Sequence, residues 1–135
     1  MKVYITAPFK NGENKAEIEH LCWLIKSSWF EDFCFIRDIE HYEKIFHDAH
    51  ELMLRAKEEI EKCEVLLIDY DWPASGRMIE LGIAYALGKK VILITSQDME
   101  VKETVAGVAD AIIYYETLED IVKPLSDLFV QWTTH

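Results

Sequence analysis

Residues 71–88, DWPASGRMIELGIAYALG, decide how we interpret this chain. They lie between two short apolar runs, 65–68 and 91–94, whose length and composition are typical of buried parallel strands. A turn leads into a predicted helix that ends at Gly88, a residue common at helix C-termini. One acidic residue, Glu80, stands in an otherwise apolar part of this helix. A carboxylate just beyond the carboxyl end of a strand lies where open α/β sheets bind ligands, so the stretch predicts a site.

Strands and helices are expected to alternate along the whole sequence. The apolar runs predict five strands, at 2–7, 33–37, 64–70, 90–95 and 110–115. Helical periodicity predicts four helices, at 14–28 with Asn14 as its cap, 48–62, 76–88, and 118–132 with an interruption near Pro124. Residues 38–46 are expected to form a loop or a broken helix.

This alternation predicts the class and topology of the fold. We expect a single α/β domain over residues 1–135, with a five-stranded parallel sheet and helices on both of its faces. The flavodoxin-like, Rossmann-like strand order 2-1-3-4-5 is our first choice. That order places the switch point between strands one and three, so the loops 7–12 and 69–76 would face each other.

Composition restricts the class of function. The net charge of −11, from 25 acidic and 14 basic residues, disfavours binding to a nucleic-acid polymer. The sequence contains no apolar run long enough to predict a membrane span. The five histidines show no metal-ligand spacing, so we expect neither a metal nor another cofactor. Cys22, Cys34 and Cys63 lie in apolar patterns, which favours free thiols and a cytoplasmic location.

Glu80 and Tyr4 are the candidate catalytic residues. A carboxylate in a partly dry pocket can attack an anomeric carbon or stabilise an oxocarbenium ion. The alternative for Glu80 is an ordinary ion pair with Arg77 on the helix surface. Tyr4 lies inside the first predicted strand, and its pattern alone favours a core aromatic residue. The sequence leaves both choices open.

Two loops supply further polar candidates. The start of the helix offers backbone N–H groups at Gly76, the Ser75 hydroxyl and the Arg77 guanidinium, which together suit a phosphate or a sugar hydroxyl. Asp69 and Asp71 close the third predicted strand, where turn formation and ligand contact are equally compatible with the pattern.

Three segments together resemble the nucleoside 2-deoxyribosyltransferase family, which includes related nucleotide N-glycoside hydrolases. They are MKVYITAPF at the N-terminus, the carboxylate-ended strand at 65–71, and SGRMIELGIAYALGKKVILIT. The resemblance runs from Met1 to about Tyr115 and is strongest at 80–84, Glu-Leu-Gly-Ile-Ala.

The resemblance implies roles for particular residues. Glu80 would be the nucleophile that takes the deoxyribosyl group, and Tyr4 would orient its carboxylate. Members are oligomers with shared active sites, so a homodimer or larger homo-oligomer is implied, with segment 102–107 of a neighbouring subunit completing the pocket. The remaining implied contacts are Ala7, Pro8 and Phe9 along the base and sugar, and Lys102 and Thr104 from the neighbour.

Two departures from the family pattern define the alternatives. Ala56 stands where members carry an aspartate that contacts the base, and Ala74 where they carry an aspartate or a phosphate-contacting serine. The prediction is cleavage or transfer at the N-glycosidic bond of a (deoxy)nucleoside or nucleoside 5′-monophosphate. Arg77 and Lys102, if they face the pocket, favour a phosphorylated substrate and hydrolysis. The alternatives are a catalytically impaired nucleotide-binding module and, more weakly, a structural partner subunit.

Overall fold

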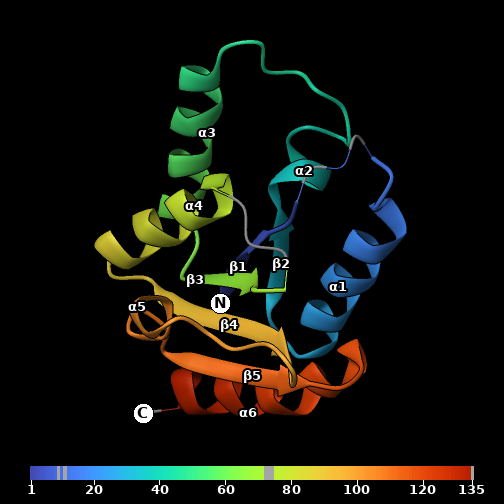
Figure 1. Ribbon diagram of the computed structural model, residues 1–135, viewed down its shortest axis with the longest axis vertical. Helices are drawn as coiled ribbons and strands as arrows, with labels where there is room; N and C mark the ends of the chain where they lie inside the picture. Colours follow the sequence, from blue (N-terminus) through green and yellow to red (C-terminus); the bar gives the residue numbers. More distant parts are fainter. Residues whose placement is uncertain (9, 11, 72–74, 135) are drawn as a thin grey trace.

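Five parallel strands form the centre of the molecule, in the order β2-β1-β3-β4-β5 (Figure 1). This computed structural model describes residues 1–8, 10, 12–71 and 75–134, with the side chain of residue 75 left out. The predicted strand order and the all-parallel sheet are confirmed. The strands are β1 (Lys2–Thr6), β2 (Glu31–Cys34), β3 (Val65–Asp69), β4 (Lys90–Ser96) and β5 (Ala111–Tyr115).

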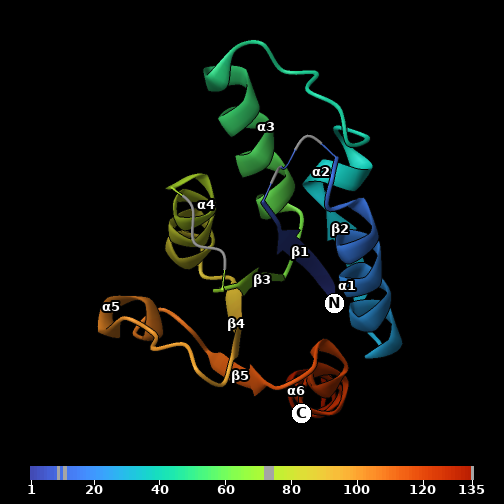
Figure 2. The ribbon, with the colours of Figure 1, turned by 45° about the vertical axis from the view of Figure 1, so that its right-hand side comes forward.

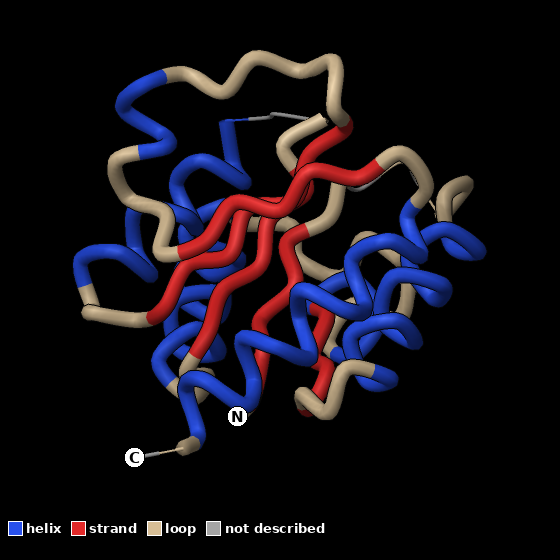
Figure 3. The backbone as a smooth tube through the Cα atoms, turned by 90° about the horizontal axis from the view of Figure 1, so that it is seen from below, coloured by secondary structure: helices blue, strands red, loops and turns tan. Residues whose placement is uncertain are grey.

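Helices cover both faces of the sheet, as predicted (Figure 2). Helices α1 and α6 pack on one face, and α3 and α4 pack on the other. Figure 3 shows the strands enclosed between these two helical layers. The helices are α1 (Lys15–Ser27), α2 (Phe35–Asp38), α3 (Ala49–Glu61), α4 (Ser75–Ala86), α5 (Glu103–Ala106), the 3₁₀ helix η1 (Leu118–Ile121) and α6 (Val122–Thr133).

The alternation of side chains along β1 divides the core in two. Val3 and Ile5 pack against α1 and α6, whereas Tyr4 joins the cluster beneath α3 and α4. Both clusters are closed by the apolar side chains of β3 and β4, which are buried on both faces as in other parallel sheets. Tyr4 therefore faces α4, the helix that carries Glu80.

The second strand is shorter than predicted. It ends at Cys34, and residues 35–37, which we expected to be extended, form α2. The Asp38 carboxylate accepts a hydrogen bond from the Cys34 N–H at 2.9 Å, and the Ile39 N–H donates to the Phe35 carbonyl at 3.0 Å. A short apolar run does not distinguish a strand from a helical turn, and these local bonds select the turn.

Three details of the helices go beyond the predictions or differ from them. Asn14 occupies the N-cap position of α1 as predicted, but its side chain makes no capping hydrogen bond; its Nδ2 donates to the Pro8 carbonyl at 2.8 Å. The predicted helix at 118–132 changes from the 3₁₀ helix η1 to α6 at Val122, two residues before Pro124, and Pro124 itself lies in the first turn of α6, where a missing N–H costs little. The sequence analysis missed α5.

The three cysteines are buried and free, in agreement with the sequence analysis. Among the helices of the described ranges, none is both long and apolar enough to cross a membrane.

Candidate active site

Tyr4 and Glu80 meet on the α3/α4 face of the sheet. Tyr4 comes from the middle of β1, and Glu80 lies in the second turn of α4. The two groups are close enough for each to shift the pKa of the other. Residues far apart in sequence are thus brought together beside the carboxyl ends of β1 and β3, at the predicted switch point.

A cavity of about 290 Å³ opens at this place. Its volume is close to the lower end of the range for small-molecule sites. Two carboxyl groups and one guanidinium are found among mainly apolar walls, as is typical of pockets that orient a ligand through a few polar contacts. The described lining consists of Tyr4, Ile5, Thr6, Ala7, Pro8, Phe35, Ile36, Glu40, Leu52, Met53, Ala56, Gly76, Arg77 and Glu80.

The environment of Glu80 raises the pKa of its carboxyl group to near neutral pH. Burial is the main cause that raises the pKa of Glu80 from 4.5 to about 7. The Tyr4 hydroxyl and the Arg77 guanidinium lower this pKa, whereas the charge of Glu40 raises it. A pKa near the operating pH keeps about half of the groups ionised, and the ionised form is the nucleophilic one.

The Tyr4 hydroxyl makes no hydrogen bond within the described part of the chain, although the side chain is fully buried. Burial raises the pKa of Tyr4 well above its usual range, and the charge of Glu80 raises it further. Buried hydroxyl groups normally have a partner. The Tyr4 hydroxyl therefore lies beside Glu80 with no hydrogen bond to any other described group, so it can donate to that carboxylate.

Arg77 fastens the start of α4 to the ends of two strands. It is only 3% exposed, and its Nε donates to the Thr6 hydroxyl at 3.2 Å. Its Nη2 donates to the backbone carbonyls of Thr6, at 3.5 Å, and of Asp69. Burial lowers the pKa of Arg77, and the charges of Asp69 and Glu80 oppose that shift. The expected alternative, a pair with Glu80 on an exposed helix surface, is wrong.

A second cavity, of about 250 Å³, lies on the opposite face of β1. Arg77 lines both cavities, as do the loop residues Ala7 and Pro8. Asp69 lines the second cavity and accepts hydrogen bonds from the Tyr115 hydroxyl at 3.2 and 3.3 Å. Burial raises the pKa of Asp69. Asp69 and Glu80 therefore lie in different cavities.

Asp71 ties the end of β3 to β4. Its carboxylate accepts from the Thr95 hydroxyl and the Ser96 N–H, each at 2.9 Å, and from the Tyr115 hydroxyl at 3.4 Å. The Asp71 N–H in turn donates to the Asp69 carboxylate at 3.1 Å. These bonds give both aspartates a part in the turn, one of the two roles that the pattern left open.

The other predicted contacts divide into three groups. Ala7, Pro8 and Gly76 line the first cavity. Lys102 and Thr104 are exposed and line neither cavity within this chain. Ser75 opens α4, with its side chain outside the description, and Phe9 and Ala74 lie outside the described residues.

Sequence reasoning missed several polar residues at these cavities, and Glu40 and Tyr115 are two of them. Glu40 lines the first cavity together with Glu80, and Tyr115 lines the second. Tyr115 ends a predicted strand, so the strand-end rule that selected Asp69 also applied to it. Nothing in the pattern marks Glu40, because its position depends on the unpredicted helix α2. No cluster of three or more potential metal ligands occurs within the described ranges.

Comparisons with solved structures show the same fold in other proteins. A CMP N-glycosidase from Clostridium botulinum is 22% identical, with a TM-score of 0.66 over 94% of this chain and 99% of that one. A 2-deoxyribosyltransferase from Bacillus psychrosaccharolyticus is 20% identical, with a TM-score of 0.71 over 90% of each chain. A conserved protein from Enterococcus faecalis is 14% identical, with a TM-score of 0.77 over 95% of this chain and 98% of that one.

The sequence comparison is more specific than the shared fold. No curated protein sequence matches the chain. The model of one family, described as nucleoside 2-deoxyribosyltransferase, matches residues 3–121, which include Tyr4, Glu40, Glu80 and all of the parallel sheet except Lys2. The chain belongs to the nucleoside 2-deoxyribosyltransferase family.

Proposed function

We propose that this protein cleaves or transfers at the N-glycosidic bond of a (deoxy)nucleoside or nucleoside 5′-monophosphate, with Glu80 as the nucleophile. One observation carries the proposal: the Glu80 carboxyl group lines a cavity beside the uncommitted Tyr4 hydroxyl. Family membership supplies the class of bond. The names of two structural relatives, a CMP N-glycosidase and a 2-deoxyribosyltransferase, agree with that class.

The reaction would proceed in two steps at C1′ of the sugar. In the first, an Oε of ionised Glu80 attacks C1′ while the C1′–N bond breaks, and its electron pair leaves with the base. The Tyr4 hydroxyl would hold the carboxylate in position and stabilise its charge. In the second, water or another base attacks C1′ of the glycosyl ester and releases Glu80 as a carboxylate. Water gives hydrolysis, and a second base gives transfer.

The sugar end of the substrate would face the start of α4. Gly76 lines the cavity there, and the first N–H groups of a helix suit a phosphate or a hydroxyl group. Arg77 adds positive charge to this wall, although its described hydrogen bonds go to the protein. Lys102 and Thr104, exposed on another part of the chain, would reach the cavity of a neighbouring copy in a homo-oligomer.

The direct test is base release from a panel of nucleosides and 5′-monophosphates, followed by chromatography. We expect wild-type protein to release base from at least one member of the panel. Glu80→Gln, which keeps the size of the side chain but cannot act as a carboxylate, should lose on the order of 10³-fold or more of that rate. No turnover by the wild type, or an unchanged rate in the variant, would contradict the proposal.

A nucleotide-binding module without the chemistry is the second candidate. Ala56 favours it, because this buried residue lines the cavity with a methyl group where family members carry an acid. Thermal stabilisation by a nucleoside monophosphate with no product formed would select this candidate. Product formation would eliminate it.

A further inference from the structure

Glu40 places a second carboxyl group in the cavity of Glu80. We propose that Glu40 recognises and protonates the leaving base, and that it selects bases with an amino group beside a ring nitrogen, such as cytosine and adenine. This inference rests on the proposed function and identifies its substrate class. It also supplies an acid to a cavity whose wall at Ala56 is apolar.

The Glu40 side chain is buried without a partner. It is 8% exposed, and no residue of the described ranges gives its carboxyl group a hydrogen bond or an ion pair. Carboxyl groups are seldom buried unless they are paired, because loss of hydration is costly. Since the residue lines the cavity, a ligand can supply the missing partner.

A strained turn fixes the Glu40 backbone. The N–H groups of Ile39 and Glu40 both donate to the Phe35 carbonyl, at 3.0 and 3.1 Å. The next two residues, His41 and Tyr42, have φ angles of +52° and +63°, in the left-handed region that side chains other than glycine seldom adopt. Such conformations persist only where the surroundings impose them, and they are common at functional sites.

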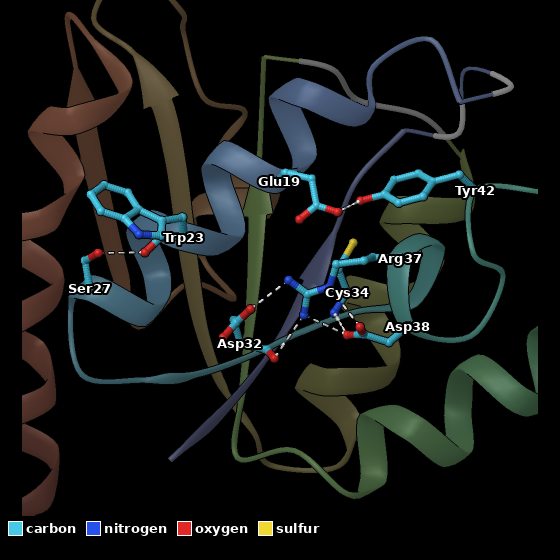
Figure 4. A network of polar contacts seen from close by, with 8 residues as sticks. All are labelled: Glu19, Trp23, Ser27, Asp32, Cys34, Arg37, Asp38 and Tyr42. Atoms are coloured by element: carbon cyan, nitrogen blue, oxygen red, sulfur yellow. Dashed lines mark hydrogen bonds and ion pairs between the residues drawn. The ribbon is translucent and has the colours of Figure 1, made fainter.

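The surroundings that impose this turn are shown in Figure 4. Before Glu40, the Arg37 guanidinium joins Asp32 of β2 and Asp38 of α2, each at 2.8 Å. After Glu40, the Tyr42 hydroxyl donates to the Glu19 carboxylate of α1 at 2.6 Å. Glu40 is therefore anchored to the sheet on one side and to α1 on the other, which keeps its carboxyl group at the cavity.

The two carboxyl groups of the cavity influence each other. Burial raises the pKa of Glu40, and the charge of Glu40 raises the pKa of Glu80. Like charges that share a site do not ionise independently, so one carboxyl group favours the protonated form of the other. The pair therefore shares one proton, and the first step requires this proton on Glu40 and the charge on Glu80. A ring nitrogen bound at Glu40 would favour that arrangement, as would Tyr4 and Arg77, which lower the pKa of Glu80.

A protonated Glu40 would match the edge of an amino-substituted base. Its O–H would donate to the ring nitrogen, and its carbonyl oxygen would accept from the adjacent amino group. As the C1′–N bond breaks, the Glu40 proton moves to the ring nitrogen and Glu40 becomes a carboxylate, paired with two N–H donors of the base. An oxo base offers a carbonyl oxygen beside a ring N–H, so a protonated Glu40 can also hydrogen-bond to it. That oxygen is a much weaker base than a ring nitrogen, so it does not take the Glu40 proton as the bond breaks, and the discrimination lies in the rate.

Glu40→Gln tests the inference, because the amide keeps the size and hydrogen bonds of the side chain but has no proton to transfer. The readouts are base release from 2′-deoxycytidine and 2′-deoxyuridine 5′-monophosphates, and binding of both compounds by calorimetry. We expect the wild type to release cytosine faster than uracil. Glu40→Gln should lose about 10²-fold in the rate of cytosine release and most of this rate preference, whereas its binding of the cytosine compound should persist because the amide keeps both hydrogen bonds. The exposed Glu43, on the same loop, provides the matched control Glu43→Gln.

A furanoside whose leaving group is para-nitrophenolate separates this inference from the proposed function. That anion leaves without protonation. Glu40→Gln should therefore hydrolyse this furanoside within about threefold of the wild-type rate, whereas Glu80→Gln should lose the activity. Glu40→Asp, which retains the acid, should restore the cytosine preference. Failure of the wild type on every substrate would refute the nucleophile proposal, and binding would still test Glu40: Glu40→Leu, which has no hydrogen-bonding group, should bind the cytosine compound more weakly than the wild type, and equal binding would overturn the inference. In an active enzyme, no rate preference in the wild type, or one unchanged in Glu40→Gln, would overturn it.

Discussion

Glu40, just after α2, and Glu80, on α4, line one cavity, and the charge of Glu40 raises the pKa of Glu80. We expect Glu40→Gln to move the titration of Glu80 to lower pH, because the variant removes a neighbouring negative charge. The wild-type group should titrate near pH 7. NMR of ¹³C-labelled glutamate carboxyl groups measures both midpoints without any need for substrate. The other charged or polar neighbours of Glu80, Tyr4 and Arg77, are unchanged in this comparison.

The same titration should appear in the activity. Since attack needs the ionised carboxylate, kcat/KM for base release should rise with pH up to about 7, and because the leaving base takes the Glu40 proton, it should fall again at higher pH. Glu43→Gln, an exposed change on the same loop, should leave the midpoint where it is. A wild-type profile that is flat between pH 5 and pH 8 would show that Glu80 ionisation does not control the rate.

Glu80→Gln should reveal the cost of burying the charge. The raised pKa means that the folded state favours the protonated form, so the stability from Glu80 is complete at low pH and declines as pH rises through about 7. The glutamine variant lacks this decline. The difference in free energy of unfolding between the variant and the wild type should therefore increase, in favour of the variant, by on the order of 3 kcal/mol from pH 4 to pH 8. Urea denaturation at several pH values measures the difference, and parallel stability curves would contradict the prediction.

Tyr4→Phe should separate catalysis from stability. The Tyr4 hydroxyl has no hydrogen bond within the described ranges, so its removal should leave the free energy of unfolding within about 1 kcal/mol of the wild type. Loss of the group that orients Glu80 should lower kcat by about 10- to 100-fold. Tyr114→Phe is the control for loss of a tyrosine hydroxyl, because Tyr114 is half exposed and lines neither cavity. Equal kcat values for the two variants would remove Tyr4 from the mechanism.

The sequence predicted those parts of the fold that depend on long apolar patterns. The five strands and their alternation with helices follow from the apolar runs, and the strand order is our first choice by analogy with flavodoxin-like sheets. The pairing of Tyr4 with Glu80 comes from the family resemblance, because the pattern of Tyr4 alone favours a core aromatic residue. Glu40 was not predictable in this way. Its position depends on the four-residue helix α2 and on positive φ angles at His41 and Tyr42, which no glycine signals in the sequence.

The role of Arg77 was hidden for a different reason. Its spacing from Glu80 is that of an ordinary pair on a helix surface, yet the side chain is buried. Two of its acceptors are backbone carbonyls, at Thr6 and Asp69. Every residue carries a carbonyl, so such partners leave no trace in a sequence pattern, and only the folded structure shows them.

Arg77→Met should therefore act first on stability. Methionine fills much of the same volume but leaves the Thr6 and Asp69 carbonyls without this donor, which should cost about 2–4 kcal/mol in the free energy of unfolding. Lys123→Met is the control for loss of a cation, because Lys123 is 84% exposed and pairs with Asp127 across one turn of α6. That control should change the stability by less than about 0.5 kcal/mol. Guanidinium denaturation of both variants gives the comparison. If Arg77→Met keeps wild-type stability and only raises KM for 5′-monophosphates, the residue serves the substrate phosphate and not the junction of α4 with the sheet.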